Sequence, residues 1–382
     1  MKKTMVAATV PALMMMCGMA HAQSSVTLYG LIDEGLDFTS NANGHHAYQM
    51  VSGDTMGSRW GIRGSEDLGG GLSAIFRLEN GFDLNDGQAG QGGAEFGRQA
   101  YVGLSSRRLG TFTMGTQYDP TIDMWSPFTS SGNLMGDLSA HPFDNDNADW
   151  DYRIHNSVKY VSPTVAGFTG EAMYGFSNQA GGFADDRMYS AAGSYKMGPI
   201  SAALAYMKTN GGSATTTGAV SSATGVFTAQ SQQNIDAGLS YAFESKAVVS
   251  LAYSHVDVYN PSANAYFGTQ PKAGTQNSWK FDNYEINGQY FFKPDFWMAA
   301  AYTFTTAQIA TTTGHTTPKW NQVSMMLDYD LSKRTSVYVQ GAYQHADGNT
   351  GLAFDDADIL GSAEPSTSAN QMVYRVALLH RF

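Results

Sequence analysis

The feature that most constrains the fold is a set of segments in which apolar and polar residues alternate. Residues 283–292, 322–330 and 337–344 place apolar side chains at every second position, as Ile286 beside Glu285 illustrates. Successive side chains of a β-strand point to opposite faces, so each segment is a strand with one apolar and one polar face. One soluble core has no room for so many apolar faces. The pattern favours an all-β fold whose apolar face lies in a membrane, a transmembrane antiparallel β-barrel.

Short turns alternate along the chain with longer loops rich in Gly, Asn, Ser and Thr. An outer-membrane barrel shows this alternation because short turns lie on its periplasmic side and long loops on its extracellular side. About fifteen such connections predict about 16 strands, an even number as these barrels use. The predicted turns are at 67–71, 107–110, 162–167, 197–199, 243–247, 293–295 and 331–334, and the predicted loops are at 40–53, 85–94, 120–152, 178–185, 210–231, 260–279, 309–318 and 348–369.

The first 22 residues read as a cleaved secretory signal peptide. Two lysines near the start are followed by an apolar stretch over 4–19 and by Ala-His-Ala at 20–22, just before Gln23. A basic start, a short apolar core and an Ala-x-Ala ending are typical of such peptides, and the core is too short for a membrane-spanning helix. We therefore expect residues 23–382 to form the mature barrel.

Removing that segment would leave no cysteine, because Cys17 is the only one, and would move the formal net charge from −11 to −13 with the loss of two lysines. An acidic chain lacks the basic surface that nucleic acid binding needs. No later stretch approaches the ~18 consecutive apolar residues of a transmembrane helix. The 42 glycines, 21 tyrosines and 14% charged residues fit a barrel. A large soluble all-β protein is the alternative, but it does not explain the regular connections.

Aromatic residues gather beside the short turns, for example Tyr241 and Phe243 at one turn and Phe292 and Trp297 around another. Rings at a fixed height form the interfacial girdle of a membrane barrel. The last strand alternates and ends in Phe382, an arrangement that resembles the signal read by the outer-membrane assembly machinery. We therefore expect the barrel-assembly machinery to be a partner of the chain.

Six sequence blocks resemble segments of one protein family: 23–33 (QSSVTLYGLID), 58–69 (SRWGIRGSEDLG), 96–104 (FGRQAYVGL), 117–120 (QYDP), 156–160 (NSVKY) and 380–382 (HRF). In these blocks the chain closely resembles the Gram-negative porins of the β-proteobacteria, the Burkholderia/Neisseria group. The resemblance covers the mature chain and implies a homotrimer of 16-stranded barrels with the third extracellular loop folded into the lumen. The Pro-Glu-Phe-Gly-Gly loop signature of enteric porins is absent, so loop details are not carried over from that branch.

The third long loop, residues 120–153, is the longest connection and carries the predicted channel chemistry. Long loops without secondary structure of their own are uncommon and tend to be functional. The large apolar side chains of Trp125 and Phe128 are not expected in a loop that is fully exposed to water. A mixture of apolar and acidic residues is instead typical of a segment packed inside a water-filled barrel. We therefore expect this loop to narrow the lumen. Its predicted constriction acids are Asp119, Asp123 and Asp137.

The wall that faces this loop is expected to carry arginines. The resemblance places constriction arginines at Arg59, Arg98 and Arg153, with Arg63 and Arg77 as further candidates. Arg59 and Arg63 lie on the same face of their strand, and apolar residues lie on the other face. This arrangement favours the lumen for both arginines, because a charge facing lipid at mid-depth costs about 2–4 kcal/mol. Arg98 shares its parity with apolar neighbours, so either a bulge intervenes or its assignment is wrong.

These expectations combine into a general porin of the cell outer membrane, through which ions and small hydrophilic solutes diffuse passively. Arginines on the wall and aspartates on the loop would set up a transverse field that biases ion entry and orients dipolar solutes. Such a sieve is not an enzyme and needs neither cofactor nor metal. Its expected partners are two further copies of the chain, outer-membrane lipid and lipopolysaccharide.

Two other classes remain as alternatives. A substrate-specific outer-membrane channel lines its path with a ladder of aromatic residues, whereas the aromatics here cluster near strand ends. A barrel enzyme needs a histidine with a carboxylate and a nucleophile or water in hydrogen-bond reach. His45, His46 and His141 form no recognisable catalytic pattern. Residues 144–149 resemble a calcium loop, but Asp149 stands where such a loop needs glycine.

Overall fold

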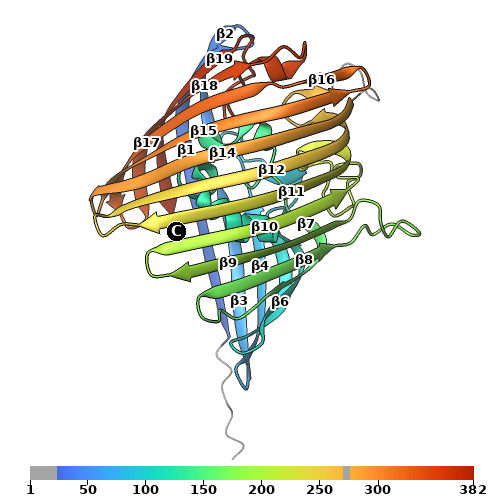
Figure 1. The fold of residues 1–382 in the computed structure, drawn as a ribbon. Helices are drawn as coiled ribbons and strands as arrows, with labels where there is room; N and C mark the ends of the chain where they lie inside the picture. Colours follow the sequence, from blue (N-terminus) through green and yellow to red (C-terminus); the bar gives the residue numbers. More distant parts are fainter. Residues whose placement is uncertain (1–23, 270–275) are drawn as a thin grey trace, which may run out of the picture.

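The computed structural model describes residues 24–269 and 276–382. They form a closed antiparallel barrel of 16 strands, as predicted, and the first and last strands pair to close it (Figure 1). The predicted signal peptide, residues 1–22, lies outside the described residues. No helix in the described part of the chain is long and apolar enough to cross a membrane.

Nineteen strand segments make up the 16 barrel strands. The segments are β1 (Ser25–Ala42), β2 (His45–Ser52), β3 (Arg59–Gly69), β4 (Leu72–Gly81), β5 (Gln99–Ser106), β6 (Gly110–Gln117), β7 (Ile154–Val161), β8 (Phe168–Gly175), β9 (Met188–Met197), β10 (Ile200–Asn210), β11 (Phe227–Ala242), β12 (Ala247–Asn264), β13 (Gly268–Thr269), β14 (Gln276–Lys293), β15 (Phe296–Thr311), β16 (Gly314–Thr316), β17 (Lys319–Ser332), β18 (Thr335–Asp347) and β19 (Asn370–Arg381). β2 and β3 pair with consecutive parts of β1 and so form one interrupted strand. β13 and β16 extend the pairing of β12 and β15 beyond β14 and β17.

The alternation along the strands separates an outer from an inner face. In β14, Tyr284 and Ile286 are each 49% exposed, whereas Asn283 and Glu285 are 0% and 4% exposed. A lipid-facing surface must be apolar, and a lumen must offer polar groups to water. The predicted partition of apolar and polar faces is therefore confirmed.

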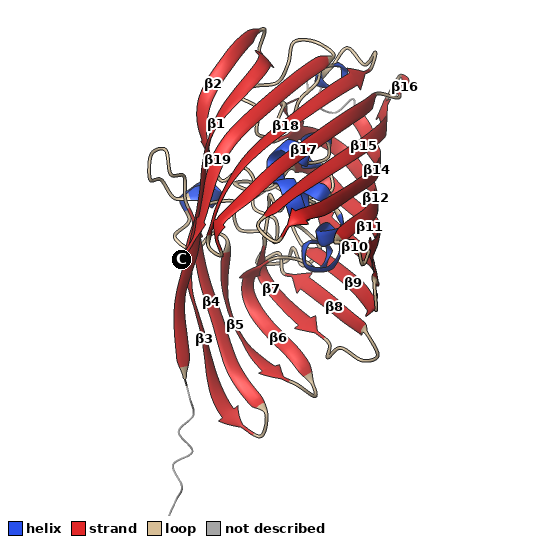
Figure 2. Cartoon of the chain, turned by 90° about the vertical axis from the view of Figure 1, so that its left-hand side faces the viewer, coloured by secondary structure: helices blue, strands red, loops and turns tan. Residues whose placement is uncertain are grey.

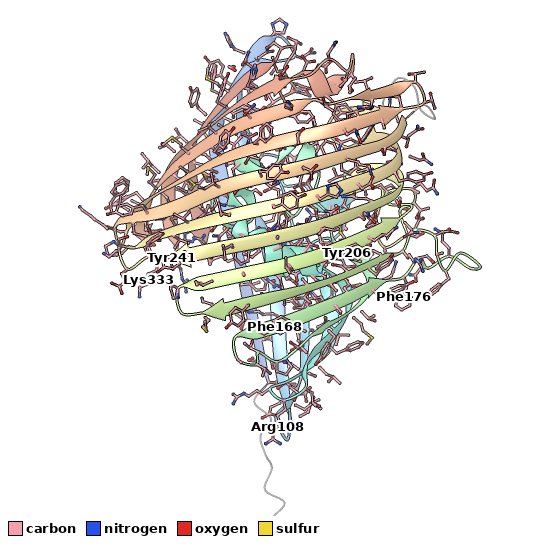
Figure 3. All side chains as sticks on the ribbon, viewed as in Figure 1. Arg108, Phe168, Phe176, Tyr206, Tyr241 and Lys333 are labelled. Atoms are coloured by element: carbon pink, nitrogen blue, oxygen red, sulfur yellow. The ribbon has the colours of Figure 1, made fainter. Side chains whose placement is uncertain are left out.

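Aromatic side chains stand on the outer surface beside the short turns. Phe168 and Tyr241 are exposed, and Figure 3 shows Tyr241 close to the rim at which Lys333 lies. Phe176 lies at the opposite rim in the same view. Rings at both rims correspond to the two interfacial girdles of a membrane barrel.

The seven predicted short turns all connect consecutive strands, but the predicted loop at 40–53 is wrong. These residues form a tight hairpin between β1 and β2, in which Ala42 pairs with His45 around Asn43 and Gly44. Both turn residues have positive φ angles, 48° and 87°, which Asn-Gly adopts at low cost in two-residue hairpins. The irregular segment comes later, at 53–58, between β2 and β3.

Three further loops are shorter than predicted. β11 begins within the predicted loop 210–231, β12 and β14 both extend into 260–279, and β15 extends into 309–318. Strands that project beyond the membrane need only backbone hydrogen bonds, so they tolerate the polar residues that we interpreted as loop. The boundaries of these three loops were therefore wrong, and residues 270–275 of the second loop lie outside the described residues.

The third long loop, residues 118–153, folds into the lumen as predicted, and Figure 2 shows its short helices inside the barrel. Trp125 is fully buried, and its indole nitrogen donates to the carbonyl of Ala237 on β11 at 3.0 Å. The helices of this loop are η1 (Thr121–Trp125), η2 (Ser126–Phe128), η3 (Ser131–Met135), η4 (Gly136–Ser139) and η5 (Pro142–Asp144). Two others, α1 (Gly90–Gly93) and η6 (Ala353–Asp355), lie in the loops before β5 and β19.

A buried ion cluster crosses the seam where β1 meets β19. Arg375 of β19 is 3.3 Å from an oxygen of Asp33 and 2.9 Å from one of Asp37, both on β1. At the end of the same seam, Gly30 and the terminal Phe382 exchange two backbone hydrogen bonds. The last residue is therefore part of the closure of the barrel.

Candidate pore constriction

Polar side chains of the barrel wall hold the lumenal loop, residues 118–153, against β12–β18. Gln340 donates to the carbonyl of Met135 at 2.6 Å, and Asn287 donates to the carbonyl of Phe128 at 2.8 Å. These amides are the inward-facing residues of the strand pattern. They satisfy loop carbonyls that would otherwise be buried without a partner. One side of the lumen is thus filled by the loop.

Aromatic residues extend this filled side toward the long loops. Phe143 of the lumenal loop, Trp320 of β17 and Phe354 of η6 are each at most 1% exposed and pack edge to face. Trp279 and Phe281 of β14 join the same cluster. This part of the barrel interior is a dry apolar core, which the sequence analysis missed.

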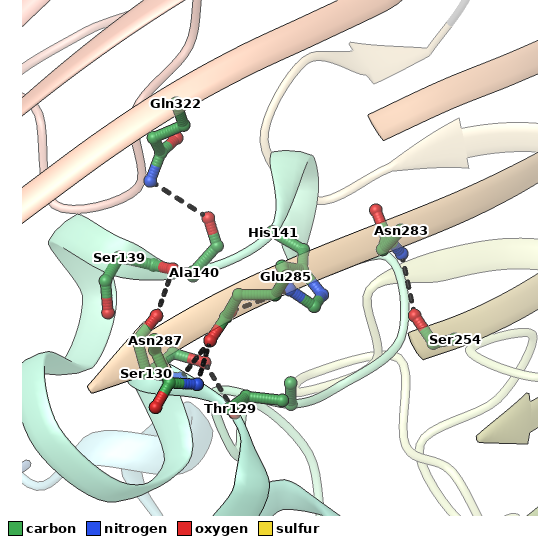
Figure 4. Close-up of polar contacts among 12 residues, drawn as sticks. Thr129, Ser130, Ser139, Ala140, His141, Ser254, Asn283, Glu285, Asn287 and Gln322 are labelled. Atoms are coloured by element: carbon green, nitrogen blue, oxygen red, sulfur yellow. Dashed lines mark hydrogen bonds and ion pairs between the residues drawn. The ribbon is translucent and has the colours of Figure 1, made fainter. Parts of the chain in front are cut away.

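His141 lies at the centre of the contact between the lumenal loop and β14 (Figure 4). Its ring nitrogens are 2.6 Å from a carboxylate oxygen of Asp146 and 3.0 Å from one of Glu285, and all three side chains are fully buried. Burial lowers the pKa of His141, but the two carboxylates outweigh it and hold the pKa well above its usual value. The imidazolium therefore joins the loop to the wall. Because both nitrogens contact carboxylates, neither is left to activate a hydroxyl; Ser254 donates to Asp146 instead.

Three of the five predicted wall arginines line one cavity on the other side of the lumen. Arg59, Arg98 and Arg153 surround a volume of about 240 Å³. Arg98 and Arg153 donate to the hydroxyl of Tyr118 at 2.8 and 3.0 Å, and Arg98 also donates to Glu79 at 3.1 Å. Tyr118 and Glu79, which the sequence analysis missed, thus fix two of the guanidinium groups.

The strand pattern did not settle the position of Arg98, and the structure does. The residue precedes β5, which begins at Gln99, so the alternation of that strand does not apply to it. Its backbone nitrogen donates to the carbonyl of Glu79, and its side chain is buried in the lumen. No bulge is needed.

Arg63 and Arg77 form a separate group. They pair across β3 and β4, and both guanidinium groups lie over the ring of Tyr29, 5.3 and 5.1 Å from its centre. Arg77 also contacts Glu79 at 2.9 Å. Neither arginine lines the cavity formed by the other three, so the structure does not bring them together with Arg59, Arg98 and Arg153. The alternation that we used predicts which face of a strand a residue occupies, but it does not predict the position of the residue along the barrel axis.

The predicted acids divide in the same way. Asp137 lines the cavity with the arginines, whereas Asp119 and Asp123 do not. Asp119 accepts a hydrogen bond from the backbone nitrogen of Thr121 at 2.8 Å, and Asp123 forms an ion pair with Lys159 of β7. Asp119 and Asp123 therefore lie outside this cavity: Asp119 binds the backbone at the start of η1, and Asp123 is paired with a lysine.

Three carboxylates that the sequence analysis did not select complete the cavity. Asp149 and Asp151 come from the end of the lumenal loop, and Asp54 comes from the irregular segment 53–58. Gly136 allows Asp54 to approach, because a Cβ on this glycine would lie 2.1 Å from the Asp54 carbonyl oxygen. We call the space between these residues the arginine–aspartate cavity. Its charged lining is Arg59, Arg98 and Arg153 with Asp54, Asp137, Asp149 and Asp151.

Burial favours the neutral form of the carboxyl groups of the cavity. Burial raises the pKa of Asp137 to about 7, and the nearby Asp151 adds to the increase. Burial together with Asp137 also raises the pKa of Asp54 and of Asp149 well above the ordinary value. Arginine stays charged throughout, so the two sides of the cavity respond differently to pH. Among the described residues, no group of three or more His, Cys, Asp or Glu is placed to hold a metal ion.

A second cavity of about 290 Å³ adjoins the first. The two share the lining residues Thr55, Met56, Ser131 and Gly132, so they lie side by side between segment 53–58 and the tip of the lumenal loop. The second cavity is lined further along by Trp297 of β15.

Comparison with protein families matches residues 7–349 to the family described as Gram-negative porin. The chain belongs to this family of porins. An outer membrane porin protein of Bordetella pertussis is 33% identical over 388 aligned residues, which cover 90% of this chain and 94% of that protein. The protein is thus an outer-membrane porin, and its resemblance to porins of the β-proteobacteria is confirmed.

Solved structures show the same barrel. The anion-selective porin from Comamonas acidovorans has a TM-score of 0.73 at 23% identity, covering 94% of this chain and 100% of that one. The trimer form of OmpT from Vibrio cholerae has a TM-score of 0.62 at 16% identity, covering 94% of this chain and 99% of that one. At these identities the similarity shows the fold alone.

Proposed function

We propose that this porin is a general diffusion channel for ions and small hydrophilic solutes, with its narrowest point at the arginine–aspartate cavity. The observation that carries the proposal is that Arg98, Arg153, Asp137 and Asp149 line one cavity inside the barrel, next to a second cavity that shares part of its lining. Opposed charges across a narrow wet gap bias which ions enter and orient dipolar solutes. Passage through it needs no cofactor and no catalytic step.

At neutral pH the channel prefers anions. The arginines remain ionised, whereas burial raises the pKa of Asp54, Asp137 and Asp149 and so favours the neutral form of these carboxyls. The net field in the cavity is then positive. The similar barrel from Comamonas acidovorans is an anion-selective porin, which supports this part of the proposal.

The functional unit is a homotrimer that sits among outer-membrane lipid and lipopolysaccharide after removal of residues 1–22. The trimer form of the Vibrio structure and the exposed apolar residues Val26, Leu28 and Leu36 on the outer face of β1 support this assembly. The barrel-assembly machinery recognises the last strand, which ends in Phe382.

Conductance of the purified protein in a planar bilayer tests the proposal. Ohmic openings that close in three equal steps, with a reversal potential that favours anions in a salt gradient, are the expected result. Folded, heat-modifiable protein without any conductance would exclude a diffusion channel. Saturation of the current by one solute class would instead favour a substrate-specific channel.

A further inference from the structure

The second cavity lies between the lumenal loop and the short turns, and it has a volume of about 290 Å³. Trp297 lies at the start of β15, Asp328 lies near the end of β17, and Arg381 is the last residue of β19. Strand ends of this kind adjoin the short turns, so the cavity faces the periplasmic side. None of the charged residues of the arginine–aspartate cavity lines it. It is therefore a site of its own.

The register of the strands places an indole ring beside a carboxylate on the inner wall. Trp297 pairs with Asp328 across β15 and β17, and Asp328 pairs with Tyr338 across β17 and β18. Directly opposite residues point to the same face, with Cβ atoms about 4.5–5.5 Å apart. Trp297 precedes the buried, inward-facing Ala299 by two residues, so it points inward as well. Its ring lines the cavity and is not part of the outer girdle.

Two polar groups of this cavity keep the capacity to bind a solute. Asp328 is 4% exposed, and among the described residues its Oδ1 atom has no hydrogen-bond donor. Buried carboxylate oxygens are normally paired, so this one indicates a donor that comes from outside the chain. The guanidinium of Arg381 is exposed and donates to the sulfur of Met56 at 3.4 Å, and a thioether sulfur is a weak acceptor. The cavity therefore offers a free acceptor and a donor whose partner is weak.

The lining has the composition expected of a site for a hydroxylated ring. A sugar ring presents an apolar C–H face, which an indole ring can cover, and a rim of hydroxyl groups that both donate and accept hydrogen bonds. Asp328 repels a simple anion and Arg381 repels a simple cation, whereas a neutral solute meets neither penalty. Besides these two residues and Trp297, the lining contains the amides of Asn133 and Gln289 and the apolar side chains of Leu134, Met326 and Leu379.

The size of the cavity limits the ligand to about one ring, because its volume of about 290 Å³ is just below the ~300–1,000 Å³ of pockets for drug-sized molecules. We propose that the cavity binds a neutral monosaccharide, with its ring stacked on Trp297 and its hydroxyl groups hydrogen-bonded to Asp328 and Arg381. The inference rests on the proposed function, because a sugar reaches the cavity only through an open pore. It adds a solute class and a place of binding to that function.

Four solutes of similar size test the proposal. Glucose and sorbitol are both neutral and hydroxylated, but sorbitol has no ring; at about pH 6 glucosamine is a cation and glucuronate an anion. The purified porin is first shown to conduct in a planar bilayer, and each solute is then titrated while the ion current is recorded. We expect glucose to interrupt the current at a half-saturating concentration about tenfold lower than that of sorbitol, and lower than that of either charged sugar. Between interruptions the ion current stays ohmic, as a general channel requires.

The failures of the inference and of the proposed function differ in this experiment. Absence of conductance contradicts the proposed function itself. With an open pore, equal interruption by glucose and sorbitol would overturn the inference, because the ring would then contribute nothing. Stronger interruption by glucosamine or by glucuronate would overturn it in favour of a cation site or an anion site.

Two variants place the sugar in the cavity. Trp297→Ala should abolish the preference for glucose over sorbitol, with ion conductance retained. Asp328→Asn keeps the shape of the side chain and so also serves if the first variant does not fold; it should raise the half-saturating concentration of glucose about tenfold. Trp60→Ala, a partly exposed tryptophan on the outer face, is the matched control and should keep the preference. An unchanged response to glucose in folded Trp297→Ala or in Asp328→Asn would overturn the inference.

Discussion

The two sides of the lumen are built from strands with the same alternation, yet one side is packed and the other is open. Along β12–β18 the inward residues hydrogen-bond to the lumenal loop or join the aromatic cluster around Trp320. Along β3–β7, Arg59, Arg98 and Arg153 line a cavity, and Glu79 accepts a hydrogen bond from Arg98 behind it. Parity decides which side chains point inward. What covers them afterwards decides whether they stabilise the barrel or meet the solute.

The largest effect is expected on the packed side. Trp320→Ala removes a fully buried ring that packs against Phe143 and Phe354. A deletion of this kind costs about 3–5 kcal/mol of folding stability. Unfolding in urea, followed by the heat-modifiable band on gels, should show a clear loss of stability with selectivity unchanged. The matched control is Trp60→Ala, a partly exposed tryptophan on the outer face, and an equal loss there would contradict the packed interior.

His141 is the next most sensitive position. His141→Leu leaves the buried carboxylates of Asp146 and Glu285 without their shared imidazolium, and breaking such a pair costs about 3–5 kcal/mol. Because the pair joins the loop to the wall, we expect frequent current fluctuations in single-channel records. His141→Gln, which can still donate one hydrogen bond, should fluctuate less. A quiet channel in His141→Leu would show that the loop is held elsewhere.

A smaller effect is expected on the open side. Tyr118→Phe removes the hydroxyl that accepts from Arg98 and Arg153. Hydrogen bonds to charged groups contribute about 1.5–3 kcal/mol, and the two guanidinium groups should become less fixed. We expect an open pore with a weaker selectivity, measured as a reversal potential closer to zero. An unchanged reversal potential would mean that Tyr118 does not position these arginines.

The smallest effect is a change of selectivity with pH. The pKa of Asp137 is raised from its ordinary 3.8 to about 7, so this carboxyl is neutral below that pH and negative above it. Anion preference should therefore fall as the pH rises through about 7, and the reversal potential in a salt gradient measures it. Asp137→Asn should reduce this dependence. A preference for anions that grows with pH would contradict the assignment.

The sequence was sufficient for the barrel, because period-two alternation and regular connections are properties of single strands and turns. The sequence was insufficient to predict where the strands end. Above the membrane, polar residues such as those of β2 can either pair as a strand or form a loop, and the sequence does not distinguish the two. Trp279 and Phe281 share the inward parity of Asn283, so extending the alternation upward would have predicted the apolar cluster.

The site was only partly predictable for a different reason. Of the predicted residues, Arg59, Arg98, Arg153 and Asp137 line one cavity, whereas Arg63 and Asp123 make contacts elsewhere. Which acids face the arginines depends on how the lumenal loop turns back on itself. A contact such as the one between the backbone nitrogen of Asp137 and the carbonyl of Asp54 has no signature in the local sequence.

Cysteine labelling tests the division of the lumen most directly, because residues 23–382 contain no cysteine. Thr55→Cys places a thiol in the lining shared by both cavities, and Ala307→Cys places one in the packed cluster. A positively charged methanethiosulfonate, added during conductance recording, should lower the current irreversibly in Thr55→Cys and leave Ala307→Cys unmodified. Rapid modification of Ala307→Cys with no effect on Thr55→Cys would place the ion path on the other side of the lumen.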